Sequence, residues 1–348
     1  MKLATFNDGS RDGQLMVVSR DLAQTHFASG IATRLQQVLD DWNFLSPQLE
    51  SLYQSLNSGR APRAFAFDAR QCMAPLPRAY QWADGSAYLN HAVLLRRARG
   101  QEPTEKMRSD PLMYQGGSDD LLGAHDDVRL PRVSWGLDFE AELAVITGDV
   151  RQGARADEAL DGVRLVALLN DWTLRERVAA ELAKGFGFLQ SKPATAFAPL
   201  VLTPDEFGAA WQGGRLHAWL EVQLNGERLA RCDTGPEMVF HFGQLIAHLA
   251  KTRRVRAGSI IGSGTVSNED RSRGVCCLAE RRAIETLDEG EPGTPWLQHG
   301  DRVHIDCVDA DGRSWFGAID QRVVPAREAV RTSDIAANDA DVQGAAAG

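Results

Sequence analysis

The stretch from residue 137 to residue 171 constrains the fold most strongly, because it holds two segments with the patterns of β-strands. In the first segment, LDFEAELAVI, apolar residues alternate with acidic ones, which is the period-two pattern of a strand. In the second, residues 163–169, nearly every side chain is apolar, as in a buried strand. The stretch therefore predicts two strands of a sheet, the second of them buried.

Three carboxylates of this stretch indicate a metal site. Glu140 and Glu142 are two positions apart, so on a strand they share one face, with Cα atoms roughly 6.5–7 Å apart. Neighbouring carboxylates repel each other unless they are solvated, protonated or bridged by a cation. Asp171 follows the second strand, and together the three offer the oxygen ligands that a hard cation prefers. The alternative is a solvated strand face at the two glutamates, with Asp171 capping a helix.

Composition and charge narrow the class of protein. Of the 348 residues, 43% are hydrophobic and 24% are charged, which is ordinary for a soluble globular protein. The net charge of −9 argues against a general affinity for nucleic acid or anionic membranes. No apolar run approaches the roughly 18 residues of a membrane helix, and the N-terminus lacks an apolar signal core. Five cysteines without CxxC spacing favour a reducing compartment, so we expect a cytoplasmic protein.

The chain divides into an N-terminal module, a larger unit and a tail. Residues 1–75 contain short strands, the turn-rich NDGSRDG and two helical stretches. Residues 76–326 form the larger unit, in which an Asn-Gly pair at 225–226 predicts a hairpin. Residues 327–348 are rich in Ala, Asp and Gly, and we predict that they form a disordered tail.

A ligand and a base are predicted upstream of the central stretch. The segment from about Ser86 has a helical pattern that Asp84 or Ser86 is placed to cap. Asp84 and His91 are seven positions apart, which is two helical turns and roughly one face. A carboxylate and an imidazole that face the same way suit a metal ligand beside a base. The alternative for His91 is an ordinary core or surface histidine.

Further candidates lie downstream of the central stretch. Arg175 follows Asp171 by one turn of a predicted helix, and Lys192 would be a useful electrophile if it were buried. GSGTVS follows a short apolar strand, so backbone N–H groups near Gly264 and Thr265 are placed to face a ligand oxygen. The alternative there is a plain glycine turn.

Other catalytic classes lack their motifs in this chain. There is no GxSxG nucleophile elbow, no HExxH zinc motif and no GxxxxGK[ST] phosphate loop. The adjacent Cys276 and Cys277 lie in an apolar run and are expected to pack as small hydrophobic residues. What remains is a site of oxygen ligands with one histidine in range, which implies a magnesium-, calcium- or manganese-dependent reaction on an oxyanion-rich substrate.

Taken together, the motifs resemble those of the fumarylacetoacetate hydrolase family. They are DFEAELAVI, LLNDWTLRER, the lysine of QSKP, and GSGTVSN followed by CCLAERR, in this order within residues 80–320. The resemblance implies a β-rich α+β fold, with a small barrel-like N-terminal module and a larger C-terminal β-roll or pseudo-barrel. It also implies a homodimer.

The resemblance also implies roles for individual residues. The metal would be held by Asp84, Glu140, Glu142 and Asp171, with Mg²⁺ as the expected ion and Ca²⁺ or Mn²⁺ as alternatives. The catalytic residues would be His91 as the base, Glu280 as its partner and Lys192 as a stabiliser of the oxyanion. The residues around the substrate would be Arg175, Tyr114, Thr265 and Gly264.

The implied reaction is the hydrolysis of a carbon–carbon bond in a small 1,3-dicarbonyl acid, such as fumarylacetoacetate or an acylpyruvate in aromatic catabolism. Two alternatives stay open: decarboxylation, hydration or isomerisation of a 2-oxo acid at the same metal site, and a family member that binds metal or ligand without turnover. Ser86 stands where the fumarylacetoacetases have a substrate-contacting tyrosine, and Val178 replaces a glutamine that helps to stabilise the oxyanion. These departures leave the acyl group of the substrate open.

Overall fold

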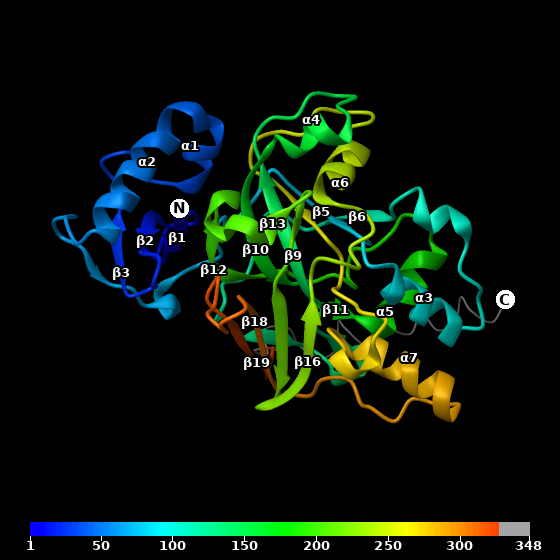
Figure 1. Ribbon diagram of the computed structural model, residues 1–348. Coiled ribbons are helices and arrows are strands. Elements are labelled where there is room, and N and C mark those ends of the chain that lie inside the picture. The colour runs from blue at the N-terminus through cyan, green and yellow to red at the C-terminus, as the bar shows by residue number, and fades with distance from the viewer. Residues whose placement is uncertain (327–348) are drawn as a thin grey trace.

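Two open β-sheets organise the protein, and the computed structural model describes its residues 1–326 (Figure 1). The larger sheet contains, in spatial order, β4 (Phe65–Ala66), β3 (Gln24–Phe27), β2 (Gln14–Val18), β1 (Lys2–Phe6), β12 (Ala196–Leu202), β10 (Val163–Asn170), β9 (Ala141–Thr147), β17 (Ser259–Gly262), β5 (Gln81–Gly85) and β6 (Met113–Gly116). The smaller sheet contains β16 (Glu227–Asp233), β15 (Trp219–Leu224), β18 (Arg302–Val308), β19 (Ile319–Pro325) and β7 (Val128–Leu130). The predicted tail at residues 327–348 lies outside the described residues.

Shorter elements complete the described fold. The two-stranded pairs are β8 (Leu137–Asp138) with β11 (Thr173–Leu174), and β13 (Trp211–Gln212) with β14 (Arg215–Leu216). The α-helices are α1 (Leu35–Asp40), α2 (Trp42–Asn57), α3 (Leu89–Ala98), α4 (Ala156–Leu160), α5 (Arg175–Ala183), α6 (Phe242–Leu249) and α7 (Leu278–Glu289). The 3₁₀ helices are η1 (Ala69–Gln71), η2 (Glu105–Arg108), η3 (Val133–Trp135), η4 (Pro204–Ala210) and η5 (Arg271–Arg273). The β-rich α+β fold is confirmed.

The N-terminal residues extend the larger sheet. Strand β1 pairs antiparallel with β12, so β1 to β4 continue the sheet formed by the later strands and do not close into a separate barrel. Helices α1 and α2 cover this end of the sheet, at the blue side of Figure 1. The boundary near residue 75 stays a prediction.

The central strands β9 and β10 are buried because apolar layers cover both of their faces. On β9, Leu143 and Val145 pack into one core, whereas Ala144 and Ile146 pack into another that includes side chains of α1 and α2. Successive strand residues point to opposite faces, so a strand between two cores needs apolar residues at nearly every position. This explains the apolar run at residues 163–169 and confirms that it is a buried strand.

The strand directions bring one end of four neighbouring strands together. Strand β9 is antiparallel to β10 and to β17, and β17 is parallel to β5. The start of β9 therefore lies beside the ends of β10, β17 and β5. Side chains at these positions converge on one edge of the sheet, although the residues are far apart in the sequence.

The structure corrects the start of the helix that was predicted from about Ser86. Asp84 lies on strand β5, and α3 begins only at Leu89. Its N-cap is Tyr88, which makes no side-chain capping bond. The helical spacing that placed Asp84 and His91 on one face was therefore wrong. A strand followed by a helix positions these two residues instead.

Other predicted elements are confirmed. The hairpin of β15 and β16 turns at Asn225 and Gly226, which have φ angles of 55° and 86°. Positive φ at both turn positions matches the type I′ geometry that an Asn-Gly pair favours. Helix α5 confirms the helix predicted after Asp171 and begins at Arg175.

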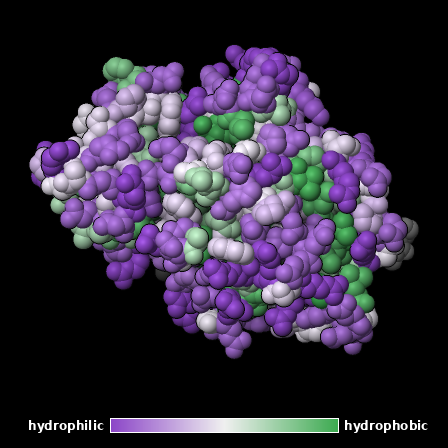
Figure 2. Space-filling view, in the orientation of Figure 1, coloured by the Kyte–Doolittle hydropathy of each residue, from purple (hydrophilic) through white to green (hydrophobic). Residues whose placement is uncertain are grey.

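Figure 2 shows a mainly hydrophilic face, with apolar side chains gathered at the right of the view over the region of α3 and α7. None of the helices in residues 1–326 combines the length and apolar character that crossing a membrane requires. All five cysteines are buried and free.

Candidate active site and metal centre

Three of the four predicted metal ligands meet at the converging strand ends. Asp84 comes from β5, Glu142 from β9, and Asp171 directly follows β10. One carboxylate oxygen of each lies within 4.8 Å of the others, and all three side chains are buried. Gly262 of β17 stands between these strands, and a Cβ there would lie 2.3 Å from Asp84 Oδ1. The missing side chain leaves room for the carboxylates.

The electrostatics of this carboxylate cluster fit a divalent cation. Burial, followed by the nearby Asp171 carboxylate, raises the pKa of Asp84 to about 8. Burial and the Asp84 carboxylate raise the pKa of Glu142 well above its usual value. Glu142 Oε2 is buried and has no hydrogen-bond partner. A buried acceptor without a donor costs about 1–3 kcal/mol or more, and a bound cation would remove both this cost and the repulsion between the carboxylates.

Glu140 occupies a different position from the one predicted. It lies in a break between β8 and β9, so Glu140 and Glu142 do not belong to one continuous strand. Its carboxylate lies 2.7 Å from Arg175 Nη2 and 2.5 Å from Lys192 Nζ. Burial opposes ionisation of Glu140, but these two cations outweigh it and lower the pKa. Glu140 is therefore an ionised neighbour of the cluster and borders it through Lys192.

Lys192 is buried, as its predicted role requires. Its ammonium donates to Glu140 and, over 2.6 Å, to Asp171 Oδ2. Asp171 also accepts from the Tyr114 hydroxyl at 2.5 Å and from Thr195 Oγ1 at 2.9 Å. Burial alone would lower the pKa of Lys192, but the two carboxylates raise it above its usual value. Lys192 is therefore a permanent cation within the site, and Thr195 is a contributor that the sequence analysis missed.

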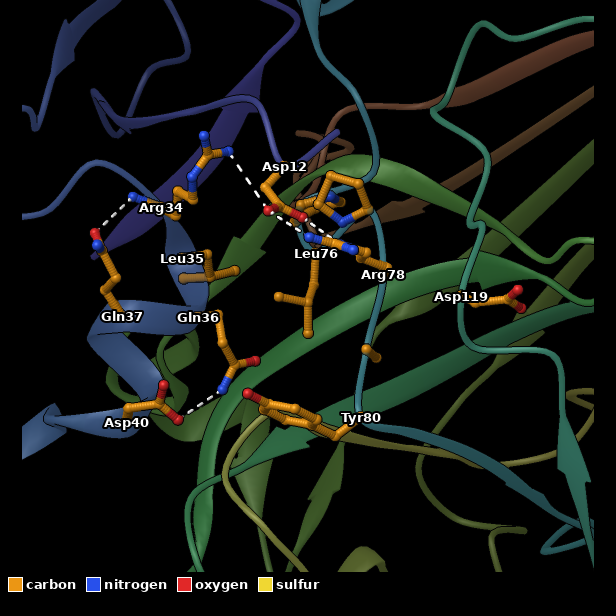
Figure 3. Close-up of a pocket in the computed structure, with 13 residues that line it drawn as sticks. Asp12, Arg34, Leu35, Gln36, Gln37, Asp40, Leu76, Arg78, Tyr80 and Asp119 are labelled. Atoms are coloured by element: carbon orange, nitrogen blue, oxygen red, sulfur yellow. Dashed lines mark hydrogen bonds and ion pairs between the residues drawn. The ribbon is translucent and has the colours of Figure 1, made fainter. Parts of the chain in front are cut away.

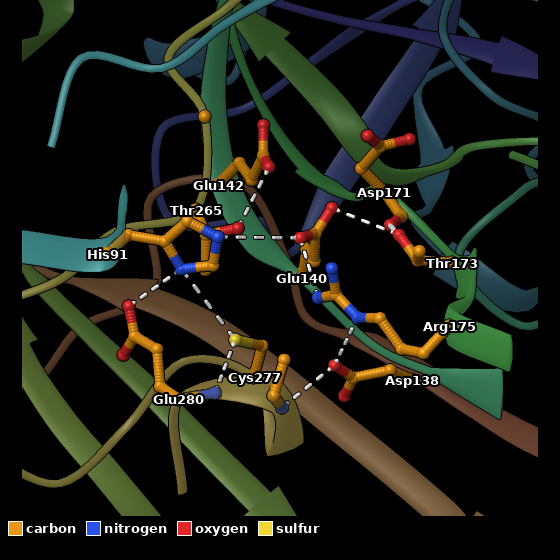
Figure 4. A network of polar contacts seen from close by, with 12 residues as sticks. His91, Asp138, Glu140, Glu142, Asp171, Thr173, Arg175, Thr265, Cys277 and Glu280 are labelled. Carbon is orange, nitrogen blue, oxygen red and sulfur yellow. Dashed lines mark hydrogen bonds and ion pairs between the residues drawn. The ribbon is translucent and has the colours of Figure 1, made fainter. Parts of the chain in front are cut away.

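His91 and Glu280 form a pair on two packed helices. Helix α3 carries His91 and packs against α7, which carries Glu280. His91 Nδ1 lies 2.8 Å from Glu280 Oε1, and Nε2 lies 4.0 Å from Glu140 Oε1 (Figure 4). A carboxylate can only accept a hydrogen bond, so Nδ1 carries the proton that it donates to Glu280. The lone pair of Nε2 then faces the carboxylate side of the site.

Asp138 connects the carboxylate side of the site with helix α7, which carries Glu280. The sequence analysis did not identify Asp138 as a site residue. It accepts from the backbone N–H groups of Leu278 at 2.7 Å and Ala279 at 3.0 Å, at the start of α7. It also accepts from Arg175 Nε at 2.9 Å. Arg175 thus links Asp138 to Glu140 through Nε and Nη2, two of the three nitrogens of its guanidinium group. The contact between Asp138 and α7 joins residues 140 positions apart, so no local pattern indicates it.

The GSGTVS segment meets the carboxylate cluster. The N–H of Gly264 donates to Asp84 Oδ1 over 2.9 Å, so this donor holds a carboxylate in place. Gly264 has a φ of +76°, and a Cβ there would lie 2.4 Å from the backbone oxygen of Gly85. Only glycine allows this approach. Thr265 Oγ1 lies 3.4 Å from Glu142 Oε1 and is buried beside it.

Cys277 was expected to pack only as a small hydrophobic residue, but it also makes polar contacts. It is fully buried, and it is also the N-cap of α7, where its sulfur accepts from the N–H of Glu280. Its Sγ lies 3.9 Å from His91 Nδ1. The sequence did contain a signal for this capping role: Glu280 follows Cys277 by three positions, a spacing that is typical of a helix N-terminus.

A separate cavity of about 510 Å³ is lined by residues 12–40 of the N-terminal segment, by residues 75–80 and by Asp119 (Figure 3). Asp12 lies in its wall and pairs with Arg78 at 2.7 Å and with Arg34 at 3.6 Å. The guanidinium groups of Arg34 and Arg78 therefore share one carboxylate partner. None of the candidate catalytic or metal-binding residues lines this cavity.

Comparisons with known proteins agree on one family. The sequence model for the fumarylacetoacetate hydrolase C-terminal part matches residues 81–324, and the model for fumarylacetoacetase N-terminal domain 2 matches residues 1–78. The 2,4-didehydro-3-deoxy-L-rhamnonate hydrolase of Sphingomonas sp. is 29% identical over 186 residues, which are 53% of this chain and 59% of that protein.

Solved structures share the fold. The fumarylacetoacetate hydrolase of Exiguobacterium antarcticum aligns with a TM-score of 0.65 and 17% identity, over 94% of this chain and 100% of that one. The maleylpyruvate hydrolase of Sphingobium sp. SYK-6, in complex with manganese(II) and pyruvate, aligns with a TM-score of 0.61 and 19% identity over the same shares of 94% and 100%. At these identities the similarity establishes the fold.

Proposed function

The chain belongs to the fumarylacetoacetate hydrolase family, and from this premise we propose that it hydrolyses a carbon–carbon bond in a 1,3-dicarbonyl acid. The observation that carries the proposal is the His91–Glu280 pair, whose Nε2 faces the carboxylate side of the site. A metal site without a positioned base would suit simple binding equally well. The hydrogen-bonded pair adds a group that can take a proton from water.

The carboxylate cluster is the proposed metal centre. Asp84, Glu142 and Asp171 would hold a divalent cation, with Glu140 beside them. When bound, the cation supplies Lewis-acid polarisation of a substrate carbonyl. Oxygen ligands suit Mg²⁺, Ca²⁺ and Mn²⁺, and we propose Mg²⁺ as the ion. The manganese in the maleylpyruvate hydrolase structure supports a divalent ion of this class.

The proposed proton transfers use His91 in both directions. Nε2 accepts a proton from water while the water oxygen bonds to the substrate carbonyl carbon. The carbon–carbon bond then breaks, its electron pair stays on the departing carbon, and that carbon takes the proton back from the imidazolium. The products are two acids. Glu280 holds the imidazole in the tautomer that leaves Nε2 free, and it stabilises the charged ring between the two transfers.

Lys192 and Arg175 have different roles in this proposal. The Lys192 ammonium is buried among carboxylates and remains charged, so it can stabilise an oxyanion that develops on the substrate. Arg175 is bound on both sides by Asp138 and Glu140. We therefore assign it to positioning Glu140, and its Nη1 donors keep it a candidate for substrate contact. Tyr114, held by Asp171, stays a candidate for substrate contact.

The test is the loss of the diketone absorbance of fumarylacetoacetate and simple acylpyruvates. Protein stripped with a chelator is assayed with and without added Mg²⁺ or Mn²⁺, and the products are identified. We expect loss of absorbance that requires the metal and yields two acids. Tight metal binding without turnover of any 1,3-dicarbonyl acid would contradict the proposal. Release of CO₂ from a 2-oxo acid, or its isomerisation, would then assign the alternative reaction.

A further inference from the structure

A second set of possible metal ligands lies on the opposite side of the His91 ring from the carboxylate cluster. We propose that His91 Nδ1, Cys277 Sγ and one Glu280 carboxylate oxygen form a binding site for a thiophilic divalent cation, with Zn²⁺ as the best fit, and that occupancy of this site switches off the base. The binding site stands on geometry alone. The inhibition rests on the proposed function of His91.

The distances are close to those of a zinc site. The three ligand atoms lie within 4.8 Å of one another, with Sγ to Nδ1 at 3.9 Å and Nδ1 to Oε1 at 2.8 Å. Zinc binds sulfur at about 2.3 Å and nitrogen or oxygen at about 2.0–2.2 Å, so a tetrahedral site has ligand atoms roughly 3.2–3.7 Å apart. The sulfur is therefore slightly too far and the carboxylate oxygen slightly too near. Small side-chain rotations would bring both into range.

The ligand types separate this site from the carboxylate cluster. Asp84, Glu142 and Asp171 offer only oxygen, which suits Mg²⁺ and Mn²⁺. A thiolate with an imidazole and one carboxylate is a mixed set that favours zinc over magnesium. The two sites would therefore discriminate between ions by chemistry, even though Glu140 and the His91 ring are neighbours.

The surroundings of Cys277 favour a metal-bound thiolate over a free one. Cys277 is fully buried, and burial raises the pKa of its thiol well above the usual value, so the free protein contains an unreactive thiol. At the N-cap of α7, a 12-residue helix, a negative sulfur is stabilised by the helix dipole and by the N–H of Glu280. The Arg175 guanidinium also favours the anion. On binding, the thiol proton passes to solvent and the cation takes its place.

Binding at Nδ1 explains why the base would stop working. A neutral imidazole has one protonated nitrogen and one lone pair. With the Nδ1 lone pair on a cation, the proton must reside on Nε2, which then has no lone pair for water. The cation also takes the Glu280 oxygen that holds the productive tautomer. His91 is 13% exposed, so an ion can reach the ring without unfolding the domain.

Cobalt(II) provides a spectroscopic test that is independent of activity. Wild-type protein in excess Mg²⁺ is titrated with Co²⁺, because a cysteine ligand gives a strong thiolate-to-cobalt absorption band and carboxylates do not. We expect a band that saturates at one equivalent and that Zn²⁺ abolishes. Absence of the band in the wild-type protein would overturn the proposal, whether or not any substrate is turned over.

Two neighbouring cysteines form a matched pair of variants. Cys277→Ser keeps an N-cap acceptor for α7 but removes the thiolate, so the band should disappear. Cys276→Ser removes an adjacent, equally buried thiol and should retain it. A band that persists in Cys277→Ser, or that is lost in Cys276→Ser, would overturn the assignment. His91→Gln leaves every cysteine in place and should weaken Co²⁺ binding at least about tenfold, since even outer-shell changes cost about 10–100-fold. Unchanged Co²⁺ affinity in His91→Gln would also overturn it.

Zinc inhibition then tests the second half of the proposal. At saturating Mg²⁺, the Zn²⁺ concentration that halves the rate should rise at least about tenfold in Cys277→Ser, measured against that variant's own zinc-free rate. It should be unchanged in Cys276→Ser. Equal sensitivity of both variants would show that zinc acts elsewhere. If no substrate is turned over, the proposed function fails, while the cobalt band still decides whether the site exists.

Discussion

The two sides of the active site are built from different kinds of structure. The oxygen side consists of Asp84, Glu142 and Asp171 at the ends of hydrogen-bonded strands, whose register fixes their positions. The opposite side consists of His91 and Glu280 on α3 and α7, which are positioned by helix packing. The strand side concentrates like charges that destabilise the metal-free fold. The helix side is internally paired. One side is thus organised to hold a cation, and the other to move a proton.

Glu140, Arg175 and Asp138 join the two sides. Arg175 binds Glu140 beside the carboxylate cluster and Asp138 beneath the start of α7. A displacement of the sheet edge would therefore be transmitted to the helix that carries Glu280. The comparison predicts that damage to the strand side should affect Mg²⁺ binding and stability, whereas damage to the helix side should affect the reaction and leave Mg²⁺ binding nearly unchanged.

Glu142→Gln should have the largest effect. It removes a ligand, so Mg²⁺ binding should be lost and activity should fall by more than about a thousandfold, because Lewis-acid polarisation contributes several kcal/mol. It also removes one of the repelling carboxylates, so the metal-free protein should melt at a higher temperature than wild type. Calorimetric titration and thermal melts check both effects. Asp127→Asn, on the exposed surface, is the control, and retained Mg²⁺ affinity in Glu142→Gln would refute the ligand assignment.

His91→Gln should lower kcat by about 10²–10⁴-fold, the usual contribution of a general base. Mg²⁺ affinity should stay nearly unchanged, since the imidazole is not among the carboxylate ligands. His125→Gln, a change at an exposed histidine, should leave both quantities as they are. A His91→Gln variant that loses metal binding and activity together would erase the distinction between the two sides.

Glu280→Gln should lower kcat by about 10–100-fold with little change in KM, because an amide holds the imidazole but stabilises its charged form poorly. Steady-state kinetics with a substrate from the absorbance assay measure this change. Glu289→Gln lies on the exposed end of the same helix and provides the matched control. If Glu280→Gln were as active as wild type, the hydrogen bond to Nδ1 would have no role in the reaction.

The pH dependence of stability should produce the smallest effect. The pKa of Asp84 is raised from 3.8 to about 8, and that of Glu142 is also raised. Above pH 4 the folded protein therefore holds protons that the unfolded chain releases, so the free energy of unfolding falls as pH rises toward 8. The pKa of Glu140 is lowered and that of Lys192 is raised, and both groups titrate outside this window.

Thermal melts in a chelator measure this trend. The melting temperature should decrease from pH 5 to pH 8, and the stabilisation by Mg²⁺ should increase over the same range, because the metal binds ionised carboxylates. Glu142→Gln should flatten both curves. A metal-free melting temperature that rises through this window would mean that the carboxylates are solvated and do not form a buried cluster.

Local sequence patterns were sufficient for much of the fold. Alternation and apolar runs predicted β9 and β10, and the Asn-Gly pair predicted the hairpin of β15 and β16. These signals are local because side-chain direction on a strand and φ at a turn depend on adjacent residues. The same local reasoning failed for Asp84, because a seven-residue spacing fits a helix face and also fits a strand followed by a helix.

The chemistry at each position was determined by the sequence alone: which residues carry carboxylates, the imidazole and the lysine, and in what order they occur. Only the tertiary structure decided which of them meet. Strand register assembles Asp84, Glu142 and Asp171, while Glu140 pairs with Arg175 and Lys192. Helix packing places Glu280 and Cys277 at the same nitrogen of His91. The physical reason is that these contacts join residues that are far apart in the sequence. Once buried, each charged group also depends on the charges around it, and no local sequence pattern encodes either effect.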